Sequence, residues 1–210
     1  MIETNSKRNL YIKVALSSIS IVIIGLLLWK FDFEILFFIQ KYLRNDILDV
    51  IVPFYTSLGE DGIIWITVGV ILLIPKKTRK CGIMVLCALL VMLVVNNIVL
   101  KNLIARSRPC WTYPEMVDLV EIPKSYSFPS GHTVSAFAVS LVILSQHKKL
   151  GIVTVIMAAL MAFTRLYVFV HFPTDIFGGM LVGTSIACFV CFTEKKLTPI
   201  IMSKLLKKAE

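Results

Sequence analysis

The sequence predicts an all-α, polytopic membrane protein with six transmembrane helices, and three observations lead to that fold class. Hydrophobic residues make up 57% of the 210 residues and the mean hydropathy is +0.83, which excludes an ordinary soluble domain. Six stretches approach the roughly 20 apolar residues that a helix needs to cross a hydrocarbon core. Basic residues recur in alternate connections, as in short cytoplasmic loops. We expect a single domain over residues 1–210.

The six expected spans follow one another along the chain. We place them at residues 13–30, 61–75, 82–101, 131–146, 150–170 and 175–193. The second and fourth are short, so their ends draw on flanking residues. The first begins like a secretory signal, but residues 28–32 lack the small-residue pattern of a cleavage site. We therefore expect a retained membrane anchor.

Residues 31–60 mix phenylalanines with charged side chains. An amphipathic segment that lies along the outer interface explains this mixture better than a seventh span. A lid over a substrate entrance is the functional alternative. Residues 47–55 could equally be the start of the second span.

The basic residues give the orientation of the bundle. With a cytoplasmic N-terminus, most of the 22 lysines and arginines lie on the cytoplasmic side. These are Lys7, Arg8, Lys13, Lys76, Lys77, Arg79, Lys80, Lys148, Lys149, Lys195, Lys196, Lys204, Lys207 and Lys208. Both termini are then cytoplasmic in a multi-pass protein of a bacterial plasma membrane. The charge flanks spans rather than forming a basic face with interleaved aromatics, so anionic membrane lipid is the expected partner and nucleic acid is excluded.

The first of three polar clusters contains Lys101, Arg108 and Pro109 at the end of the third span. Lys101 and Arg108 are seven residues apart, so on a helix they would share one face about two turns apart. Pro109 ends or bends the segment. The alternative is that the cations extend toward lipid phosphates, and we expect Arg106 to do so.

The second cluster is Ser127-Phe128-Pro129-Ser130-Gly131-His132, at the start of the fourth span. Free N–H groups at a helix start can bind an anion, Ser130 adds a hydroxyl donor, and Gly131 permits close approach. The alternative is a plain N-cap in which Ser130 caps the helix. That alternative leaves His132 unexplained, because an ionisable residue at a membrane helix end indicates function.

The third cluster contains Thr164, Arg165, His171 and Asp175. Pro173 predicts a turn near residue 172, so that Asp175 opens the sixth span. Asp175 could serve only as a helix cap. Four residues after His171, it can also accept a hydrogen bond from one ring nitrogen and leave the other free as a nucleophile. The expected topology puts all three clusters on the extracytoplasmic side.

Taken together, the clusters resemble the signature of the type 2 phosphatidate phosphatase family, which shares its active site with bacterial acid phosphatases and vanadium haloperoxidases. The family pattern is Lys, six residues, Arg-Pro; then Pro-Ser-Gly-His; then Ser-Arg, five residues, His, three residues, Asp. Over residues 60–195 the chain departs from it only at Thr164, which keeps the hydroxyl of the family's serine.

The resemblance implies a role for each motif residue. Lys101, Arg108 and Arg165 would hold the phosphoryl oxygens, and Ser130 with the Gly131 N–H would complete the cradle. His171 would attack phosphorus to give a phosphohistidine, and Asp175 would set its tautomer. His132 would protonate the leaving oxygen and then activate water. No metal or other cofactor is expected.

The predicted function is hydrolysis of a terminal phosphate from a lipid monophosphate or pyrophosphate. Undecaprenyl pyrophosphate, phosphatidylglycerol phosphate and phosphatidate are the substrates that the resemblance offers, with isoprenoid pyrophosphate preferred. A lipid-phosphate binding or transport protein without chemistry is the alternative, but it gives no reason for His171 with Asp175 opposite His132. The oligomeric state and the role of residues 111–127 stay open.

Overall fold

The computed structural model describes the backbone of residues 2–209, and the side chains of residue 13 and residues 16–198. Within these limits the ordered elements are all helical. They are α1 (Ile2–Lys30), α2 (Asp32–Tyr42), α3 (Asp46–Ser57), the short 3-10 turn η1 (Glu60–Gly62), α4 (Ile63–Leu73), α5 (Arg79–Met92), the π-helical η2 (Leu93–Leu100), α6 (Lys101–Ile104), α7 (Pro109–Thr112), the 3-10 turn η3 (Pro114–Met116), α8 (Gly131–Gln146), α9 (Lys148–Tyr167) and α10 (Pro173–Ala209).

Three described helices are long and apolar enough to cross a membrane: residues Arg79–Ile104, Lys148–Tyr167 and Pro173–Thr198. They correspond to the third, fifth and sixth predicted spans. Helices α3 and α4 meet the same criterion together as one span bent by 51°. The described apolar parts of the first and fourth predicted spans, Leu16–Lys30 and Gly131–Gln146, are shorter. A membrane protein is therefore confirmed, while the count of six is not.

The segment 31–60 does not form one interfacial helix. It divides into α2 and α3, which are separated by an Asn45 N-cap whose side chain accepts from the Leu48 N–H. Leu36 of α2 is fully buried, and Phe33 packs edge-on against Phe172 with ring centroids 5.0 Å apart. The interfacial segment is thus not confirmed, and α3 passes the apolar-length criterion only together with α4, as a broken span or a re-entrant pair.

Helix α8 lies at the centre of the bundle and packs against α5, α9 and α10. Its residues Val134, Val139 and Val142 are fully buried. Glycine makes the close approach to its neighbours possible: a Cβ on Gly183 of α10 would lie 2.7 Å from the Val134 carbonyl oxygen. Small residues let helix backbones approach in this way in membranes, where burial alone gives little drive for helix association.

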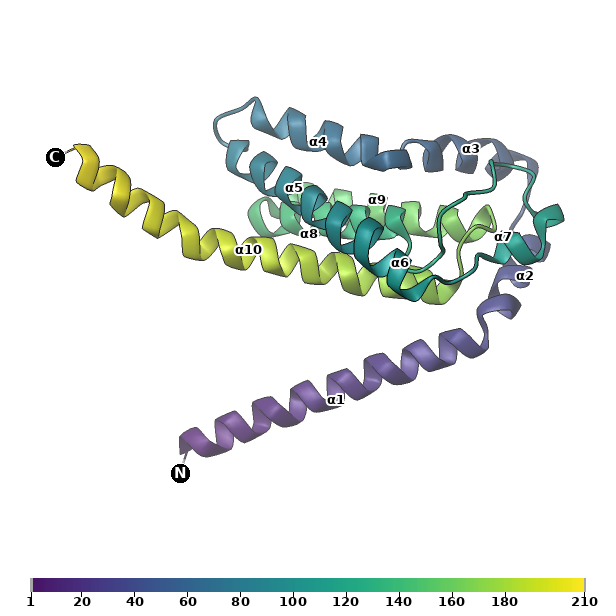
Figure 1. Cartoon of the computed structure of the whole chain (residues 1–210), viewed down its shortest axis with the longest axis horizontal. Coiled ribbons are helices and arrows are strands. Elements are labelled where there is room, and N and C mark those ends of the chain that lie inside the picture. Colours follow the sequence, from purple (N-terminus) through teal and green to yellow (C-terminus); the bar gives the residue numbers. More distant parts are fainter. Residues whose placement is uncertain (1, 210) are drawn as a thin grey trace.

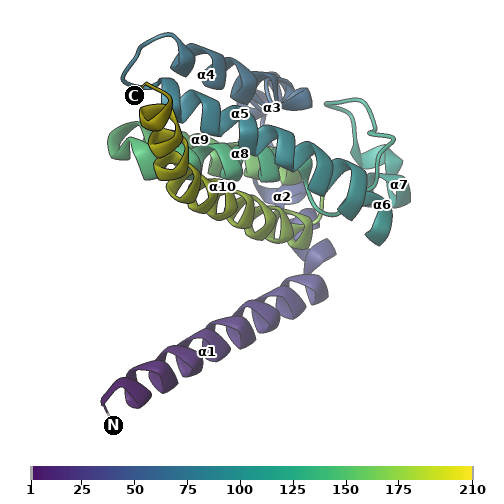
Figure 2. The ribbon, with the colours of Figure 1, turned by 60° about the vertical axis from the view of Figure 1, so that its left-hand side comes forward.

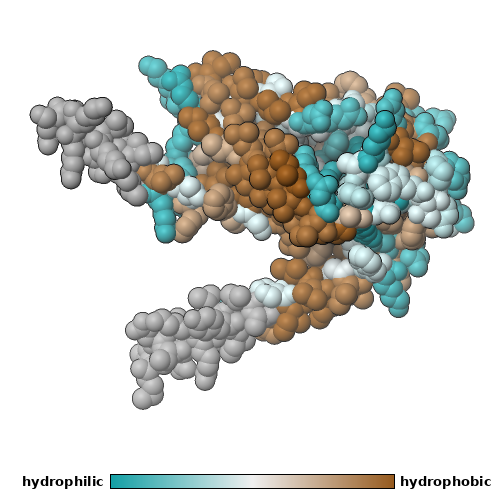
Figure 3. All heavy atoms as spheres, in the orientation of Figure 1, coloured by the Kyte–Doolittle hydropathy of each residue, from teal (hydrophilic) through white to brown (hydrophobic). Residues whose placement is uncertain are grey.

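The chain ends lie at one end of the molecule, and the segments that carry the three polar clusters lie at the other. Figure 1 shows both termini and the α4–α5 connection on the left, with α2, α6 and α7 gathered on the right. Figures 1 and 2 agree that α1 diverges from the bundle toward its N-terminus and approaches it near α2. Apolar side chains cover much of the face between the two ends, and hydrophilic ones gather at the right (Figure 3).

We predict that Gly151→Ala destabilises the α8–α9 pair. The added Cβ would lie 2.1 Å from the Leu144 Cα, so backbone rather than a flexible side chain must shift. Overpacking of this kind costs about 1–3 kcal/mol, and the midpoint of thermal unfolding in detergent should fall accordingly. Gly25→Ala is the matched control, because its nearest neighbour atom, in Phe177, is at 3.7 Å. Equal midpoints for the two variants would contradict the prediction.

Candidate active site

The three polar clusters meet where four helix ends come together. The chain leaves α6 through Ala105, whose φ of 48° ends the helix, and it leaves α9 through Phe169, whose φ is 58°. Helices α8 and α10 begin at the same place, since the Ser130 N–H donates to the Asp175 carbonyl oxygen over 3.2 Å. Pro173, at the first position of α10, suits a helix start because its missing N–H costs no internal bond. Motifs distant in sequence therefore form one site.

His171 is held between a cation and a carboxylate. Arg108 Nη1 lies 3.1 Å from Nε2, and Asp175 Oδ2 lies 3.4 Å from Nδ1. An arginine has only donors, so Nε2 must accept and the proton sits on Nδ1, facing Asp175. Asp175 also accepts from the Phe172 N–H over 2.8 Å and from the Ser127 hydroxyl. Helix capping and histidine orientation, offered as alternatives by the sequence, are both functions of this one carboxylate.

The imidazole of His171 is kept neutral by its surroundings. The side chain is fully buried, and desolvation lowers its pKa well below the usual 6.5. The positive charges of Arg108, Arg165 and Lys101 lower the pKa further. A neutral ring whose lone pair is on Nε2 has the form a nucleophile needs once Arg108 releases that nitrogen.

Lys101 and Arg108 do not lie on one face of a helix, but both contact the same hydroxyl group. Lys101 Nζ lies 3.3 Å and Arg108 Nη2 lies 3.1 Å from Ser125 Oγ. The prediction that they share a helix face is wrong, because α6 ends at Ile104 and Arg108 is extended. Arg108 is further bound by the carbonyls of Ser125, Tyr126 and Val170. Part of the stretch 111–127, left open by the sequence, thus fixes the two cations.

The start of α8 leaves polar groups without partners. Ser130 makes no capping hydrogen bond, and its buried Oγ has no partner among the described atoms. The plain N-cap alternative for Ser130 is therefore wrong. Arg165 Nε is likewise buried and unpaired within the described part of the chain. Buried donors without partners are costly, and an anion between them would satisfy both.

Thr56 joins His132 to Arg165. Its hydroxyl accepts from Arg165 Nη1 over 2.6 Å and lies 3.1 Å from Thr164 Oγ1. Its carbonyl oxygen is 3.3 Å from His132 Nε2. Three residues later, a Cβ on Gly59 would lie 2.6 Å from His132 Cδ2. The α3–η1 turn therefore forms the wall behind His132.

The sequence led us to expect that Arg106 extends toward lipid phosphates. The structure shows that this expectation is wrong. Its side chain is only 13% exposed and binds Asp32 at 2.6 Å and Asp175 at 2.7 Å. Arg106 binds Asp32 and Asp175 rather than lipid because each of these buried carboxylates accepts a short, charge-assisted hydrogen bond.

Three further contributors were missed by sequence reasoning: Asp32, Thr56 and Ser125. Ser127 was placed in the second cluster but was given no role, and it donates to Asp175. No spacing relates Asp32 or Thr56 to the motifs, which all lie far along the chain from them. The one available signal was polar residues inside apolar surroundings. Ser125 could have been suspected because it lies just before the second cluster.

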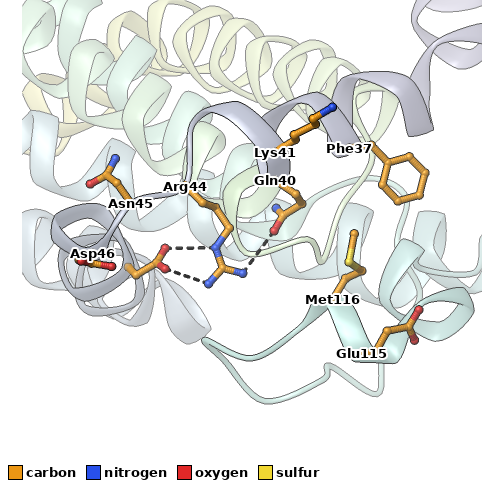
Figure 4. A pocket seen from close by; sticks show the side chains of 9 residues that line it. Phe37, Gln40, Lys41, Arg44, Asn45, Asp46, Glu115 and Met116 are labelled. Carbon is orange, nitrogen blue, oxygen red and sulfur yellow. Dashed lines mark hydrogen bonds and ion pairs between the residues drawn. The ribbon is translucent and has the colours of Figure 1, made fainter.

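Figure 4 shows a separate hollow of about 620 Å³ on α2 and the start of α3, lined in part by Gln40, Lys41 and Met116. Arg44 in its wall is bound to Asp49 and Asp118 at 2.9 Å each. Because the donors of Arg44 are used in these bonds, they are not available to a ligand. The bonds, chiefly the one to Asp49, also raise the pKa of Arg44. None of the motif residues lines this hollow.

We predict that His171 keeps a neutral, Nδ1-protonated ring to well below pH 6.5. Burial and the neighbouring cations favour the uncharged form. Nitrogen NMR of histidine-labelled protein in micelles measures the tautomer and the titration, with the signal assigned by its loss in His171→Ala. A ring that gains its second proton at or above pH 6.5 would contradict the prediction.

Comparison with known proteins places this geometry in a family. The PAP2 superfamily profile matches residues 82–198. An undecaprenyl-diphosphatase of Sulfolobus acidocaldarius is 36% identical over 155 residues, covering 72% of this chain and 73% of the relative. The Bacillus licheniformis protein named bacitracin transport permease protein BcrC is 30% identical, covering 70% and 73%.

A solved structure has the same arrangement of helices. The PAP2-type phosphatidylglycerolphosphate phosphatase of Bacillus subtilis superposes with a TM-score of 0.65 at 25% identity, covering 86% of this chain and 96% of that one. The match of a family profile to more than half of the chain, together with these relatives, confirms the resemblance stated from the motifs: the chain belongs to the PAP2 superfamily.

Proposed function

We propose that the site removes the terminal phosphate of a lipid phosphate through a covalent phosphohistidine. The chain is a membrane lipid phosphatase of the PAP2 type, and the observation that carries the mechanism is the state of His171. Its Nε2 lies 3.1 Å from Arg108 Nη1, which can only donate, and its Nδ1 lies 3.4 Å from Asp175 Oδ2.

In the first step, His171 Nε2 attacks phosphorus as the bond to the lipid oxygen breaks. His132 enters this step with a proton on each ring nitrogen and gives one to the departing oxygen, while the Nδ1 proton of His171 is held by Asp175 as that ring becomes positive. In the second step, His132 takes a proton from water, and the resulting hydroxide displaces His171 from phosphorus. Inorganic phosphate leaves, and both histidines return to their starting state.

Lys101, Arg108 and Arg165 bind the phosphoryl oxygens in this proposal. Ser130 Oγ and the Gly131 N–H complete the cradle at the positive end of α8. Most of Arg108's donors bind the carbonyls of Ser125, Tyr126 and Val170, so a phosphoryl oxygen would replace His171 Nε2 at its Nη1. That exchange frees the nucleophile as substrate binds. The cations neutralise transition-state charge, a task for which many phosphoryl transferases use magnesium.

An isoprenoid pyrophosphate is the substrate class we propose. The site lies at the end of an apolar bundle, so a lipid tail can stay in the bilayer while its headgroup reaches the cradle. One relative is named an undecaprenyl-diphosphatase, and the superposed structure is named a phosphatidylglycerolphosphate phosphatase. Turnover of a polyprenyl pyrophosphate compared with phosphatidylglycerol phosphate would decide between these classes.

We further propose six spans in a bacterial plasma membrane, with both termini cytoplasmic and the site on the extracytoplasmic side. This is supported by the separation of the chain ends and the α4–α5 connection from the polar end (Figure 1). The α4–α5 connection carries Lys76, Lys77 and Arg79, as a cytoplasmic loop should.

Transport or binding of a lipid phosphate is the second candidate, and it is favoured by the name of the Bacillus licheniformis relative, a transport permease protein. A binding protein would need the cations but would not need an oriented imidazole. Loss of activity on removal of the nucleophile separates the two candidates.

We predict that His171→Ala abolishes phosphate release from a lipid phosphate, measured on purified protein in detergent with a chelator present. His132→Ala should slow the second step, so that radiolabelled phosphate stays on the protein in acid-labile, base-stable form. Arg44→Gln serves as a control, because Arg44 lies outside the site. Near-native turnover by His171→Ala would overturn the mechanism.

Gly59→Ala should reduce kcat by about tenfold or more, because the new Cβ forces the His132 ring to move and displacement of a catalytic group by 1 Å can cost 10²-fold. Ser57→Ala, at an exposed position in the same turn, is the control and should retain wild-type turnover. Wild-type kcat in a folded Gly59→Ala protein would show that the turn does not position His132.

A further inference from the structure

Arg106 lies between the N-terminal helices and the carboxylate that faces His171. We propose that Asp32 and Arg106 are positioning residues, which hold Asp175 in place against His171 and so make the α1–α2 junction part of the active centre. This role rests on the proposed function, since it acts through Asp175 and His171.

The two oxygens of Asp175 have different partners. Oδ1 binds Arg106 Nη1 at 2.7 Å, and Oδ2 receives the Phe172 N–H at 2.8 Å and faces His171 Nδ1 at 3.4 Å. A carboxylate held at only one oxygen can rotate about its last bond. Binding of both oxygens fixes the plane in which Oδ2 meets the imidazole, so Arg106 sets the orientation of His171 indirectly.

Asp32 in turn fixes Arg106. Its Oδ2 accepts from Arg106 Nη2 at 2.6 Å, and its Oδ1 accepts from the Thr174 N–H at 2.9 Å. Thr174 Oγ1 accepts from Arg106 Nη1 and donates to Asp32 Oδ2. Asp32 is 3% exposed, and a buried carboxylate is stable only when paired and hydrogen-bonded in this way. The group is thus closed, with every member bound to the next.

The guanidinium is also held from its faces. Its central carbon lies 4.1 Å from the Phe172 ring centroid and 4.7 Å from that of Trp29. Contact with two aromatic rings together with two-sided bonding favours arginine, because lysine has no planar fork. Trp29 and Asp32 flank the break between α1 and α2, so the first helix contributes directly to this support.

The charges around His171 determine how each substitution should change the protonation of its ring. Lys101 and Arg108 face it from the third-span side, Arg165 from α9 and Asp175 from α10, and His132 stands at the start of α8. Arg106 offsets the charge of Asp175, and Asp32 offsets that of Arg106. Removal of Arg106 should therefore stabilise the protonated His171, whereas neutralising Asp32 should not.

The test is the pH dependence of kcat/KM for purified Arg106→Gln, Arg106→Lys and Asp32→Asn on a lipid phosphate, with substrate ionisation titrated separately. Arg106→Gln should lower kcat about tenfold or more, as loss of such supporting partners does at other catalytic sites, with KM little changed. The acid limb of its pH profile, where kcat/KM falls as His171 gains a proton, should move to higher pH. Asp32→Asn should lower kcat by a smaller factor and move the acid limb to lower pH. Arg106→Lys should keep the wild-type limb with reduced kcat.

Arg44→Gln is the matched control, because Arg44 also bridges two carboxylates, Asp49 and Asp118, but does not contact Asp175. It should cost comparable stability and leave the pH profile unchanged. Acid limbs that stay at the wild-type position in both Arg106→Gln and Asp32→Asn would overturn the inference. An active His171→Ala would instead overturn the proposed function, so the two failures are distinguishable.

Discussion

Crowding of positive charge around one neutral imidazole is the interaction on which the site depends. Lys101, Arg108 and Arg165 all act on the buried His171, and like charges in a poorly solvated space repel. Asp175 is the carboxylate in direct contact with the ring, so these side chains together carry an excess of positive charge. An anion is the ligand that such an arrangement favours, and in the proposed function its oxygens also bond to Ser130 Oγ and Arg165 Nε, which have no partner among the described residues.

The bilayer explains why this chemistry is built at helix ends. Irregular backbone cannot face hydrocarbon, because its polar groups would lose their hydrogen bonds. Loops that carry Ser125, Ser127 and His171 can exist only beyond the spans or within protein. The helix start at Gly131 adds N–H groups that no turn of the helix uses and a favourable dipole at the same place. The close packing of α8 with α9 and α10, permitted by Gly151 and Gly183, keeps these ends in register.

Support for the centre comes from segments outside the family motifs. Thr56 and Gly59, where α3 ends and η1 begins, contact His132, and Asp32 reaches Asp175 through Arg106. The profile match begins only at residue 82, so these residues belong to a part of the chain that the profile does not describe. The N-terminal segments thus contribute to the geometry of the site.

By itself, the sequence determined the membrane class, the order of the long apolar helices and the motif residues, because hydropathy, prolines and motif spacing are local properties of the chain. It could not decide that Lys101 and Arg108 meet at Ser125, that Ser130 is no cap, that α2 packs against the start of α10, or that Arg106 turns inward. Each of those outcomes depends on which partner is within about 3 Å after folding. Asp32 and Asp175 are 143 positions apart in sequence, and only the packing of α1 and α2 against the start of α10 brings both to one guanidinium.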